Sequence, residues 1–384
     1  MNKLFSSYKI QLDIISPVHI GSGEEYVPTD YVIKNKQLFV INRAKFISKI
    51  EKIGKYEEFL SICDSGNILK IRKFIYDNFD ESLVEFKIDV TTDIQNEYAQ
   101  KLDKPSQIES ANRRVINALE IRKLAYSNFE NKIIIPGSSI KGAIRTAILD
   151  YFAKNKEFKN DFKRNFRKLQ ECLLDMNLKD TSTDPFSKIK VSDFQLVQGS
   201  SVIDIISNIK NFDNANRKGV PVKMEIIKPE AIFQGEILIH KDSEYKIEDI
   251  LTWCNQHYLE DTYNFEKNYF KYENSAMPQI DLKKNNFYLK IGQHSGAFAV
   301  TLSTYRNGNI WHQKLKKNLD HQTTTWMSES FNMPLGWVRC KVLNENTENK
   351  NDNTTDIVKK GSNTTKPTSS DLEKLIEKFG KNHR

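Results

Sequence analysis

Cysteine is scarce in this sequence of 384 residues, and its four thiols lie far apart. Cys63, Cys172, Cys254 and Cys340 form no C-x-x-C pair, which argues against a disulfide framework and favours reduced thiols. No stretch approaches the roughly 18 uncharged apolar residues of a membrane-spanning helix. The first residues lack the apolar segment of a secretory signal. We therefore expect a cytoplasmic protein without a membrane partner.

Signatures of metal binding and catalysis are also missing. None of the seven histidines pairs with Cys, Asp or Glu at a metal-ligand spacing, and no H-E-x-x-H or G-x-S-x-G occurs. A P-loop is excluded because Gly142 is followed by Ala143 and Ile144 instead of Lys and Ser or Thr. We expect no metal and no cofactor.

The composition is that of a globular protein with a basic surface. The chain is 39% hydrophobic and 28% charged, and its length suits about two to three domains. A net charge of +8 favours a polyanionic partner, usually nucleic acid and sometimes a membrane surface. The alternative is a lysine-rich composition with a solvated surface and no such partner.

The periodicity along the first half predicts mixed strands and helices. Alternation over residues 8–14 predicts a half-buried strand, and residues 30–41 predict a hairpin that turns at Asn35-Lys36. Asn42 is expected to cap the following helix. Residues 64–130 are predicted to be a helical insertion, in which one helical stripe carries Val115, Leu119, Arg122 and Tyr126.

The second half predicts further strands and a tail of different composition. Two strands are expected around Pro229, a helix over 245–265, and a last strand in "PLGWVRCKV". Residues 344–370 are rich in Asn and Thr and are predicted to be disordered. The final residues predict a short amphipathic helix with an apolar face of Leu372, Leu375, Ile376 and Phe379.

The stretch "IIIPGSSIKGAIRTAI" carries a possible anion site. A strand leads into Pro136-Gly137, and Ser138 or Ser139 can cap a helix whose free N–H groups favour an anion. Lys141 and Arg145 share one face of that helix, and a phosphate between them would relieve their repulsion. The alternative is an ordinary capped helix whose two cations are solvated.

Two further glycine loops follow predicted strands. "SPVHIGSGEE" follows the first strand, and "YLKIGQHSGAFAV" contains a strand that ends at a loop with His294. Each motif is weak evidence by itself, and His294 alone is more typical of a hydrogen-bonding loop residue than of a catalyst. The informative feature is the combination of three such loops, each with Ser or His, in a basic chain.

The ordered set of motifs resembles a known family. "PVHIGSGEEYVPTDYVI", "IPGSSIKGAIRTAI", "IKVSDFQLV", "LKIGQHSGAFAVTL" and "PLGWVRCKV" occur in this order and together resemble the repeat-associated mysterious proteins (RAMPs) of type III-A CRISPR effector complexes. Among these the sequence is most similar to the fifth-subunit family of Csm complexes. The resemblance covers roughly residues 8–343 and leaves out the tail.

The resemblance implies an α+β fold of two ferredoxin-like (RRM-like) modules whose glycine loops grip guide-RNA phosphates. The expected modules are residues 1–198, with the helical insertion at about 64–130, and residues 199–343, followed by the tail 344–384. The implied role is a subunit that caps the 3′ end of the crRNA and supports crRNA maturation and antiviral defence. Its implied partners are crRNA, target RNA, the other Csm backbone and small subunits, and host nucleases.

The candidate RNA-binding residues are those of the three loops and their flanks. They are His19, Gly21, Ser22, Gly23, Gly137, Ser138, Ser139, Lys141, Gly142, Arg145, Lys290, Gly292, His294, Ser295 and Gly296. No aromatic-rich RNP1 motif occurs, so backbone and phosphate contacts are favoured over stacking on a sheet.

Two other functions stay open. Some relatives cleave precursor crRNA without a metal, and such an endoribonuclease needs a general base, for which His19 and His294 are the histidines in glycine loops. A purely structural module is the third possibility, and it predicts no salt-dependent RNA binding. We expect a protein that is not an enzyme.

Overall fold

The structure is a computed structural model. It describes residues 4–102, 107–108, 114–115, 119–127, 132–156, 165–210, 219–269, 277–306, 310–312, 316–319, 322 and 324–343. Across these residues no helix is long and apolar enough to cross a membrane. The predicted tail helix and the predicted disorder of residues 344–370 lie outside the described residues.

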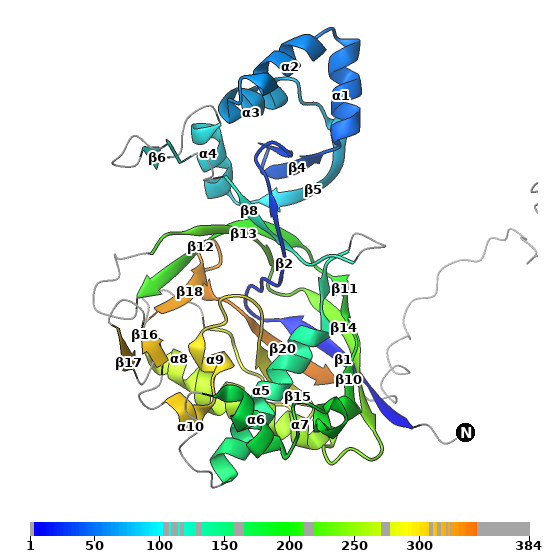
Figure 1. Cartoon of the computed structure of the whole chain (residues 1–384), viewed down its shortest axis with the longest axis vertical. Coiled ribbons are helices and arrows are strands. Elements are labelled where there is room, and N and C mark those ends of the chain that lie inside the picture. The colour runs from blue at the N-terminus through cyan, green and yellow to red at the C-terminus, as the bar shows by residue number, and fades with distance from the viewer. Residues whose placement is uncertain are drawn as a thin grey trace, which may run out of the picture. The chain divides into compact units, whose positions relative to one another are not determined.

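The first sheet, here called sheet A, brings the two halves of the chain together. Strand β1 (Phe5–Ile14) lies at its centre, antiparallel to β14 (Ile232–His240) on one side and to β20 (Trp337–Val342) on the other. The order along the sheet is β15-β20-β1-β14-β11-β9, and β10 also pairs with β14 (Figure 1). The remaining bounds are β9 Ile134–Ile135, β10 Ile189–Val191, β11 Phe194–Gln198 and β15 Asn286–Lys290.

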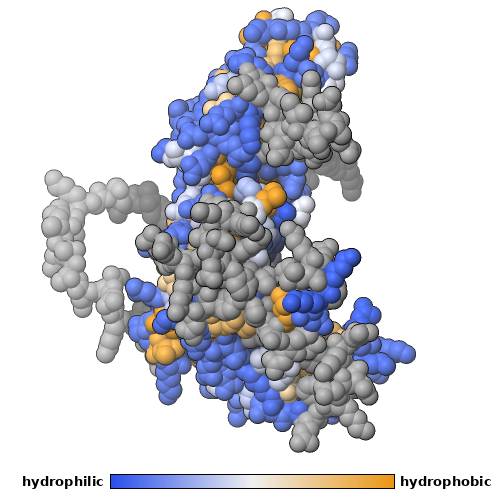
Figure 2. Space-filling view, turned by 90° about the vertical axis from the view of Figure 1, so that its left-hand side faces the viewer, coloured by the Kyte–Doolittle hydropathy of each residue, from blue (hydrophilic) through white to orange (hydrophobic). Residues whose placement is uncertain are grey.

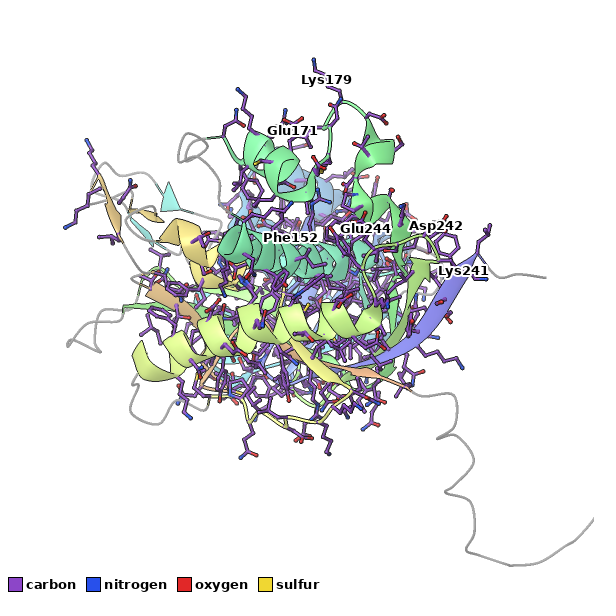
Figure 3. All side chains as sticks on the ribbon, turned by 90° about the horizontal axis from the view of Figure 1, so that it is seen from below. Phe152, Glu171, Lys179, Lys241, Asp242 and Glu244 are labelled. Atoms are coloured by element: carbon purple, nitrogen blue, oxygen red, sulfur yellow. The ribbon has the colours of Figure 1, made fainter. Side chains whose placement is uncertain are left out.

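Helices cover one face of sheet A and build the main core. Helix α5 (Gly137–Asn155) and α7 (Ile247–Asn255) lie side by side, with Phe152 of α5 packed 5.9 Å from Trp253 of α7 between ring centroids (Figure 3). Ile140, Ile144 and Ile148 are fully buried in this core, as the helical stripe predicted. Helix α7 continues through a π-helical segment (Gln256–Tyr263) into α8 (Asn264–Tyr269), and α6 (Phe166–Leu174), α9 (Ala297–Val300) and α10 (Ser303–Arg306) complete this side.

The second sheet, sheet B, runs in the order β2-β8-β13-β12-β5-β4-β3, with β18 paired to both β12 and β19. Its strands are β2 Gly21–Tyr26, β3 Tyr31–Lys34, β4 Gln37–Ile41, β5 Val84–Val90, β8 Ile121–Leu124, β12 Ser201–Lys210, β13 Val222–Ile227, β18 Thr324–Ser328 and β19 Met333–Pro334. Two short hairpins, β6 Gln107–Ile108 with β7 Arg114–Val115 and β16 Ile310–His312 with β17 Lys317–Leu319, stand apart from both sheets.

A helical layer packs beside the β3–β4–β5 part of sheet B. It consists of α1 (Arg43–Lys52), α2 (Tyr56–Asp64), α3 (Ile68–Asp77) and α4 (Thr92–Lys101). Phe46, Phe59 and Phe74 form its aromatic centre, and the Phe59 and Phe74 rings stack at 5.2 Å. On the face that Figure 2 shows, the coloured residues are mainly hydrophilic, with scattered hydrophobic patches.

Several local predictions are confirmed. The α+β class, the strand at residues 8–14, the strands on either side of Pro229, the helix over 245–265 and the last strand are all present. The hairpin turns at Asn35 and Lys36 with φ of 51° and 58°, and the Asn42 side chain accepts a hydrogen bond of 3.0 Å from the Lys45 N–H as an N-cap.

The prediction of a helical stripe over residues 115–126 is wrong. Residues Ile121–Leu124 form strand β8, which pairs antiparallel with β2 and parallel with β13. Arg, Lys and Leu have good helix propensity, but this preference is only a few tenths of a kcal/mol per residue. Pairing with a strand on each side outweighs it. Strand β5 also falls inside the predicted helical insertion, although α3 and α4 there are helical.

The two sheets interleave along the chain. Each contains strands from before and after residue 198, where the sequence placed a boundary between two modules. The pairing of β1 with β14, from Phe5 opposite His240 to Asp13 opposite Ile232, crosses that position directly. The predicted boundary therefore does not coincide with a division between the sheets.

Candidate nucleic-acid interface

The first and third glycine loops meet in the structure. The N–H of Gln293 donates a hydrogen bond of 2.8 Å to the carbonyl O of His19. Gly292 has a φ of +85°, and a Cβ atom there would overlap that same carbonyl. The glycine at position 292 is therefore needed for one loop to lie on the other. The sequence indicates both loops, but no local pattern in it predicts their contact.

The two candidate histidines lie at this junction in different surroundings. His19 is 1% exposed, and its Nδ1 lies 2.6 Å from the carbonyl O of Glu225. His294 is half-buried and stacks on Trp326 at 4.0 Å between ring centroids, with its Nε2 at 3.4 Å from Arg122. His294 also has a positive φ of 66°, which is uncommon for a residue with a side chain.

Both imidazoles are held neutral. Burial lowers the pKa of His19, and the nearby Arg122 cation adds to this effect against the hydrogen bond at Glu225. Burial, Arg122 and His19 lower the pKa of His294 to about 4. At neutral pH neither ring carries the charge that would attract a phosphate, so these residues can offer only neutral hydrogen bonds or stacking.

A buried carboxylate that the sequence did not reveal holds the first loop in place. Glu225 of β13 is fully buried and accepts hydrogen bonds from Tyr26 at 3.0 Å, Ser201 at 2.6 Å, the Leu124 N–H at 3.3 Å and Tyr126. Burial and this carboxylate raise the pKa of both tyrosines. The network ties β2, β8, β12 and β13 together directly beneath His19. A single Glu in an apolar strand was its only sequence signal.

Of the first-loop residues, only part is open to a ligand. Gly21, Ser22 and Gly23 belong to the edge strand β2 instead of a turn, and all three are exposed. A Cβ atom on Gly21 would lie 2.9 Å from the Nε2 of His19. Gly23 has a φ of +86° with nothing within 4 Å of its Cβ position, so it leaves room for a phosphate or a backbone.

The second glycine loop begins α5, but its predicted serine cap is wrong. Pro136 occupies the N-cap position without a side-chain bond, and the Gly137 N–H donates instead to Asp193 Oδ1 at 2.8 Å. A Cβ atom on Gly137 would overlap the carbonyls of Val191 and Ser192. Gly137 is thus required for helix α5 to approach the β10–β11 turn, while Ser138 stays exposed and Ser139 is half-buried.

The two cations of α5 have partners within the chain. Lys141 Nζ donates to the carbonyls of Phe186 and Ile189 at 2.8 and 2.7 Å, and burial lowers its pKa against the opposing field of Asp184. Arg145 forms an ion pair with Asp184 at 2.8 Å, with both side chains 22% exposed. These two cations hold the 184–189 segment against α5. Asp184 of this segment supplies the anion, where the sequence predicted a phosphate. Gly142 is exposed with nothing within 4 Å of its Cβ position.

The third loop offers less surface than its residue types suggest. Lys290 is 2% exposed and its ammonium forms an ion pair with buried Glu266; burial lowers its pKa, and Glu266 opposes this shift. A phosphate at Lys290 would have to displace Glu266 from the interior, contrary to the predicted surface contact. Ser295 is 5% exposed, and a Cβ atom on Gly296 would lie 2.9 Å from the Gln322 amide O.

The three loops do not form one continuous site. Within the described residues no hydrogen bond or ion pair joins Gly137–Arg145 to the residues of either other loop. The first and third loops form one junction around His19, and the start of α5 lies apart from it. The accessible predicted residues are the exposed Gly21, Ser22, Gly23, Ser138 and Gly142.

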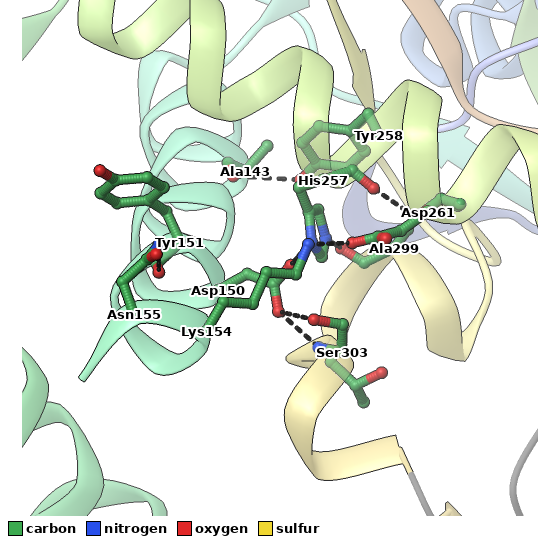
Figure 4. A network of polar contacts seen from close by, with 12 residues as sticks. Ala143, Asp150, Tyr151, Lys154, Asn155, His257, Tyr258, Asp261, Ala299 and Ser303 are labelled. Atoms are coloured by element: carbon green, nitrogen blue, oxygen red, sulfur yellow. Dashed lines mark hydrogen bonds and ion pairs between the residues drawn. The ribbon is translucent and has the colours of Figure 1, made fainter. Parts of the chain in front are cut away.

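One cluster has the composition of a metal site. Asp150, His257 and Asp261 place one ligand atom each within 4.8 Å of one another (Figure 4). The Lys154 ammonium lies 2.7 Å from Asp261 and 3.4 Å from Asp150, and thus supplies a cation to the two carboxylates. His257 Nδ1 lies 2.9 Å from Asp150, and Ser303 Oγ donates to Asp150 at 2.7 Å.

The charges of this cluster stabilise contacts between elements of the fold. Burial raises the pKa of Asp150, but hydrogen bonds from His257 and Ser303 outweigh it and the net pKa is lowered. Burial lowers the pKa of Lys154, but the carboxylates of Asp261 and Asp150 outweigh burial, and the net pKa is raised. Buried charges are satisfied here by partners on α5, the π-helical segment and the start of α10, so the cluster joins three elements.

Comparison with known proteins agrees with this fold. The family model described as the RAMP superfamily matches residues 11–298, and the chain therefore belongs to the RAMP superfamily. Within it, the chain is similar to "CRISPR system Cms protein Csm5" of Streptococcus thermophilus, at 28% identity over 319 residues, covering 80% of this chain and 83% of that protein. The Methanocaldococcus jannaschii protein of that name is also 28% identical, covering 72% of this chain and 64% of that protein.

Two solved structures share the fold. A chain in a cryo-EM structure of a Csm–crRNA–target RNA ternary complex of a type III-A CRISPR–Cas system has a TM-score of 0.61 at 17% identity. It covers 88% of this chain and 100% of its own length. A crystal structure of Csm5 from T. onnurineus has a TM-score of 0.55 at 17% identity, with 87% and 100% coverage.

Proposed function

We propose that this chain is an RNA-binding subunit of a type III-A CRISPR (Csm) effector complex. The observation that carries the proposal is a likeness over nearly the whole folded region to a chain of a Csm–crRNA–target RNA complex. The matched Streptococcus thermophilus protein supports it because 83% of its length is covered. The net charge of +8 suits a polyanionic partner.

We propose further that the subunit caps the 3′ end of the crRNA and supports crRNA maturation and antiviral defence in the cytoplasm. Its partners would be crRNA, target RNA, the Csm backbone and small subunits, and host nucleases. The element succession β1, α5, β10–β11, β14, α7, β20 supports a ferredoxin-like module in sheet A. The second such module would be built on sheet B, interleaved with the first along the chain.

The proposed RNA contacts use backbone and small side chains more than cations. The exposed positions include Ser22, Gly23, Ser138 and Gly142. Gly23 and Gly142 also have open space at their Cβ positions. A phosphate can approach such positions closely because no side chain intervenes. Lys141, Arg145 and Lys290 have partners inside the chain, so they are not among the proposed phosphate contacts.

A non-catalytic role fits the histidines best. A general base must reach a 2′-OH within hydrogen-bond distance, and His19 is 1% exposed with Nδ1 directed at a carbonyl. The endoribonuclease alternative keeps one supporting observation, because the loops of His19 and His294 are joined and both rings are neutral. Purified chain should leave precursor crRNA intact in EDTA. Cleavage that a His294→Asn variant abolishes would establish the enzyme instead.

The direct test of the subunit role is co-purification. The full chain, co-expressed with the other Csm subunits and a CRISPR array, should carry small RNA of one defined 3′ end. Assembly without RNA, or RNA of random ends, would contradict the proposed cap.

Gly142→Ala separates RNA contact from folding. Alanine should stabilise helix α5 by up to about 1 kcal/mol, because nothing lies within 4 Å of the new Cβ. If RNA approaches this turn, the same variant should bind guide RNA less tightly across a salt series. A variant that is more stable and binds RNA unchanged would remove Gly142 from the interface.

A further inference from the structure

Strand β5 is fully paired on one side only. Its partner β4 follows it from Gln37 opposite Asp89 to Ile41 opposite Val84. On its other side β12 pairs in parallel only at the end, where Val202 and Ile203 lie opposite Asp89 and Val90. Sheet B therefore splits at this point, and residues 84–88 leave an open strand edge inside the sheet.

The open edge faces a cleft of about 540 Å³. Five consecutive residues of β5, Glu85 to Asp89, line it. Successive side chains of a strand point to opposite faces, so a wall made of consecutive residues is the edge of the strand and not one of its faces. The opposite wall consists of Lys123, Tyr126, Lys132, Ile133, Leu196 and residues 199–201, and Gln37 of β4 completes the lining.

Backbone alternation identifies the groups that point into the cleft. The Val90 N–H donates to Lys36 O on the β4 side, whereas the Thr91 N–H donates to Ile203 O on the β12 side. From Phe86 to Val90 the odd-numbered residues therefore turn their N–H and C=O groups away from β4, whereas the register shift between Val40 and Ile41 interrupts the alternation at Glu85. Lys87 therefore presents its N–H and C=O to the cleft, because β12 pairs with β5 only beyond it, at Asp89 and Val90.

The charges along this edge alternate in sign. Glu85 and Lys87 are exposed on the same face of β5, and the next residue on that face, Asp89, forms an ion pair with Lys228 at 3.0 Å. An RNA strand laid along this edge would meet like charge at Glu85, since Asp89 is already paired with Lys228. An extended peptide can place an opposite charge at each position, because cross-strand neighbours also alternate. The edge thus favours a peptide over a nucleic acid.

We propose that a polypeptide segment of a partner subunit enters this cleft and adds to the open edge of β5 as a strand. The segment would carry a basic residue opposite Glu85 and an acidic residue opposite Lys87. It would continue the line of β12 and close the split in sheet B by β-augmentation. This inference rests on the proposed function only in assuming a multi-subunit complex.

Charged side chains also protect strand edges that have no partner. That explanation accounts for Glu85 and Lys87 but not for the second wall, since a merely protected edge needs no cavity beside it. Proteins usually cover or shorten such an edge, whereas here both walls leave room for one extended chain.

Amide hydrogen exchange on the unmodified full chain tests the proposal. The Lys87 amide should exchange freely in the chain alone and about tenfold or more slowly in complex with the purified Csm subunits without RNA. Protection by guide RNA alone would overturn the peptide in favour of RNA. Assembly without any protection would overturn the strand addition while leaving the proposed function intact, and failure to assemble would overturn both.

Two variants at position 87 separate the contribution of the backbone N–H from that of the side-chain charge. Lys87→Pro removes an N–H that points into the cleft and none that bonds to β4, and proline is tolerated at such an edge. It should weaken assembly with the subunits by about tenfold or more, whereas Lys87→Thr should weaken it much less. Equal effects of the two variants at unchanged melting temperatures would overturn the proposal. If the proline variant does not fold, the exchange measurement decides alone.

Discussion

At the scale of single residues, glycines with similar backbone angles have different roles. Gly23 and Gly292 have φ of +86° and +85°, but only Gly292 lies against another loop. Gly23→Ala should cost roughly 1 kcal/mol, the penalty of a side chain at positive φ. Gly292→Ala should cost clearly more, because its Cβ also overlaps the His19 carbonyl. Chemical unfolding of the two variants measures the difference, and equal losses would contradict the close contact.

His294 gives the stability a dependence on pH. Its pKa is lowered to about 4 from 6.5, so the unfolded chain binds a proton that the folded chain rejects between these values. Its stabilising contribution is therefore complete above about pH 6.5 and is lost as pH falls toward 4. Burial lowers the pKa of His19 in the same direction.

His294→Asn should flatten this dependence. Asparagine tolerates the positive φ of 66° at this position and does not titrate. The melting temperatures of the two proteins, measured from pH 7 to 4.5, should differ less at low pH than at neutral pH. Parallel curves would mean that His294 is solvated and titrates normally.

The residue types of the site could be predicted from sequence, but their exposure could not. Glycine loops indicate that another group lies close to the backbone, and other segments of the chain do so at Gly137 and Gly292. Lys290 is the last residue of strand β15, all of whose residues are buried, and its partner Glu266 lies on α8. Only the packing of α8 against sheet A decides that this cation faces inward, and no local pattern encodes that.

At the scale of elements, helix α5 is fixed by its two cations. Arg145→Ala breaks an ion pair in which Asp184 is 22% exposed, and it also removes the 3.0 Å hydrogen bond to Gln170. We expect a loss of about 1–3 kcal/mol in the free energy of unfolding. Lys73→Ala removes an exposed ion pair with Asp77 within one helix and should cost about 0.5 kcal/mol or less.

Thermal unfolding of the two variants compares the roles directly. A loss at Arg145 no larger than at Lys73 would mean that the cation is free for RNA after all. The i,i+4 spacing predicted that Lys141 and Arg145 share a face, and the fully buried Ile140–Ile144–Ile148 stripe confirms the orientation of α5. The anion they meet comes from residue 184, whose position depends on the path of the chain between α6 and β10.

At the scale of the whole molecule, chain order and spatial order differ. The local strands around residues 8–14 and 232–240 could be predicted from alternation, but their pairing could not, because sequence periodicity carries no information about distant partners. The same limit hid the contact of the first and third loops. A family resemblance supplied the fold class without the register that joins the halves.

Interleaving predicts that the halves of the chain do not fold separately. Strand β1 lies between β14 and β20, and its Ile10, Leu12 and Ile14 are almost fully buried there. A fragment of residues 1–198 would expose this face, and a fragment of 199–343 would leave β14 and β20 without the strand between them. Each burial of such a side chain is worth roughly 1.5–3 kcal/mol, which is large against a total stability of about 5–15 kcal/mol.

Expressed alone, each fragment should therefore show no cooperative melting transition, whereas co-expressed fragments should reassemble through the β1–β14 pairing. Circular dichroism melts and co-elution of the two fragments measure this outcome. A chain that ends at Leu343 is the matched control, since it keeps every strand of both sheets, and it should melt as the full chain does. Cooperative melting of either isolated half would show that residues 1–198 and 199–343, the two modules that the resemblance implies, fold separately.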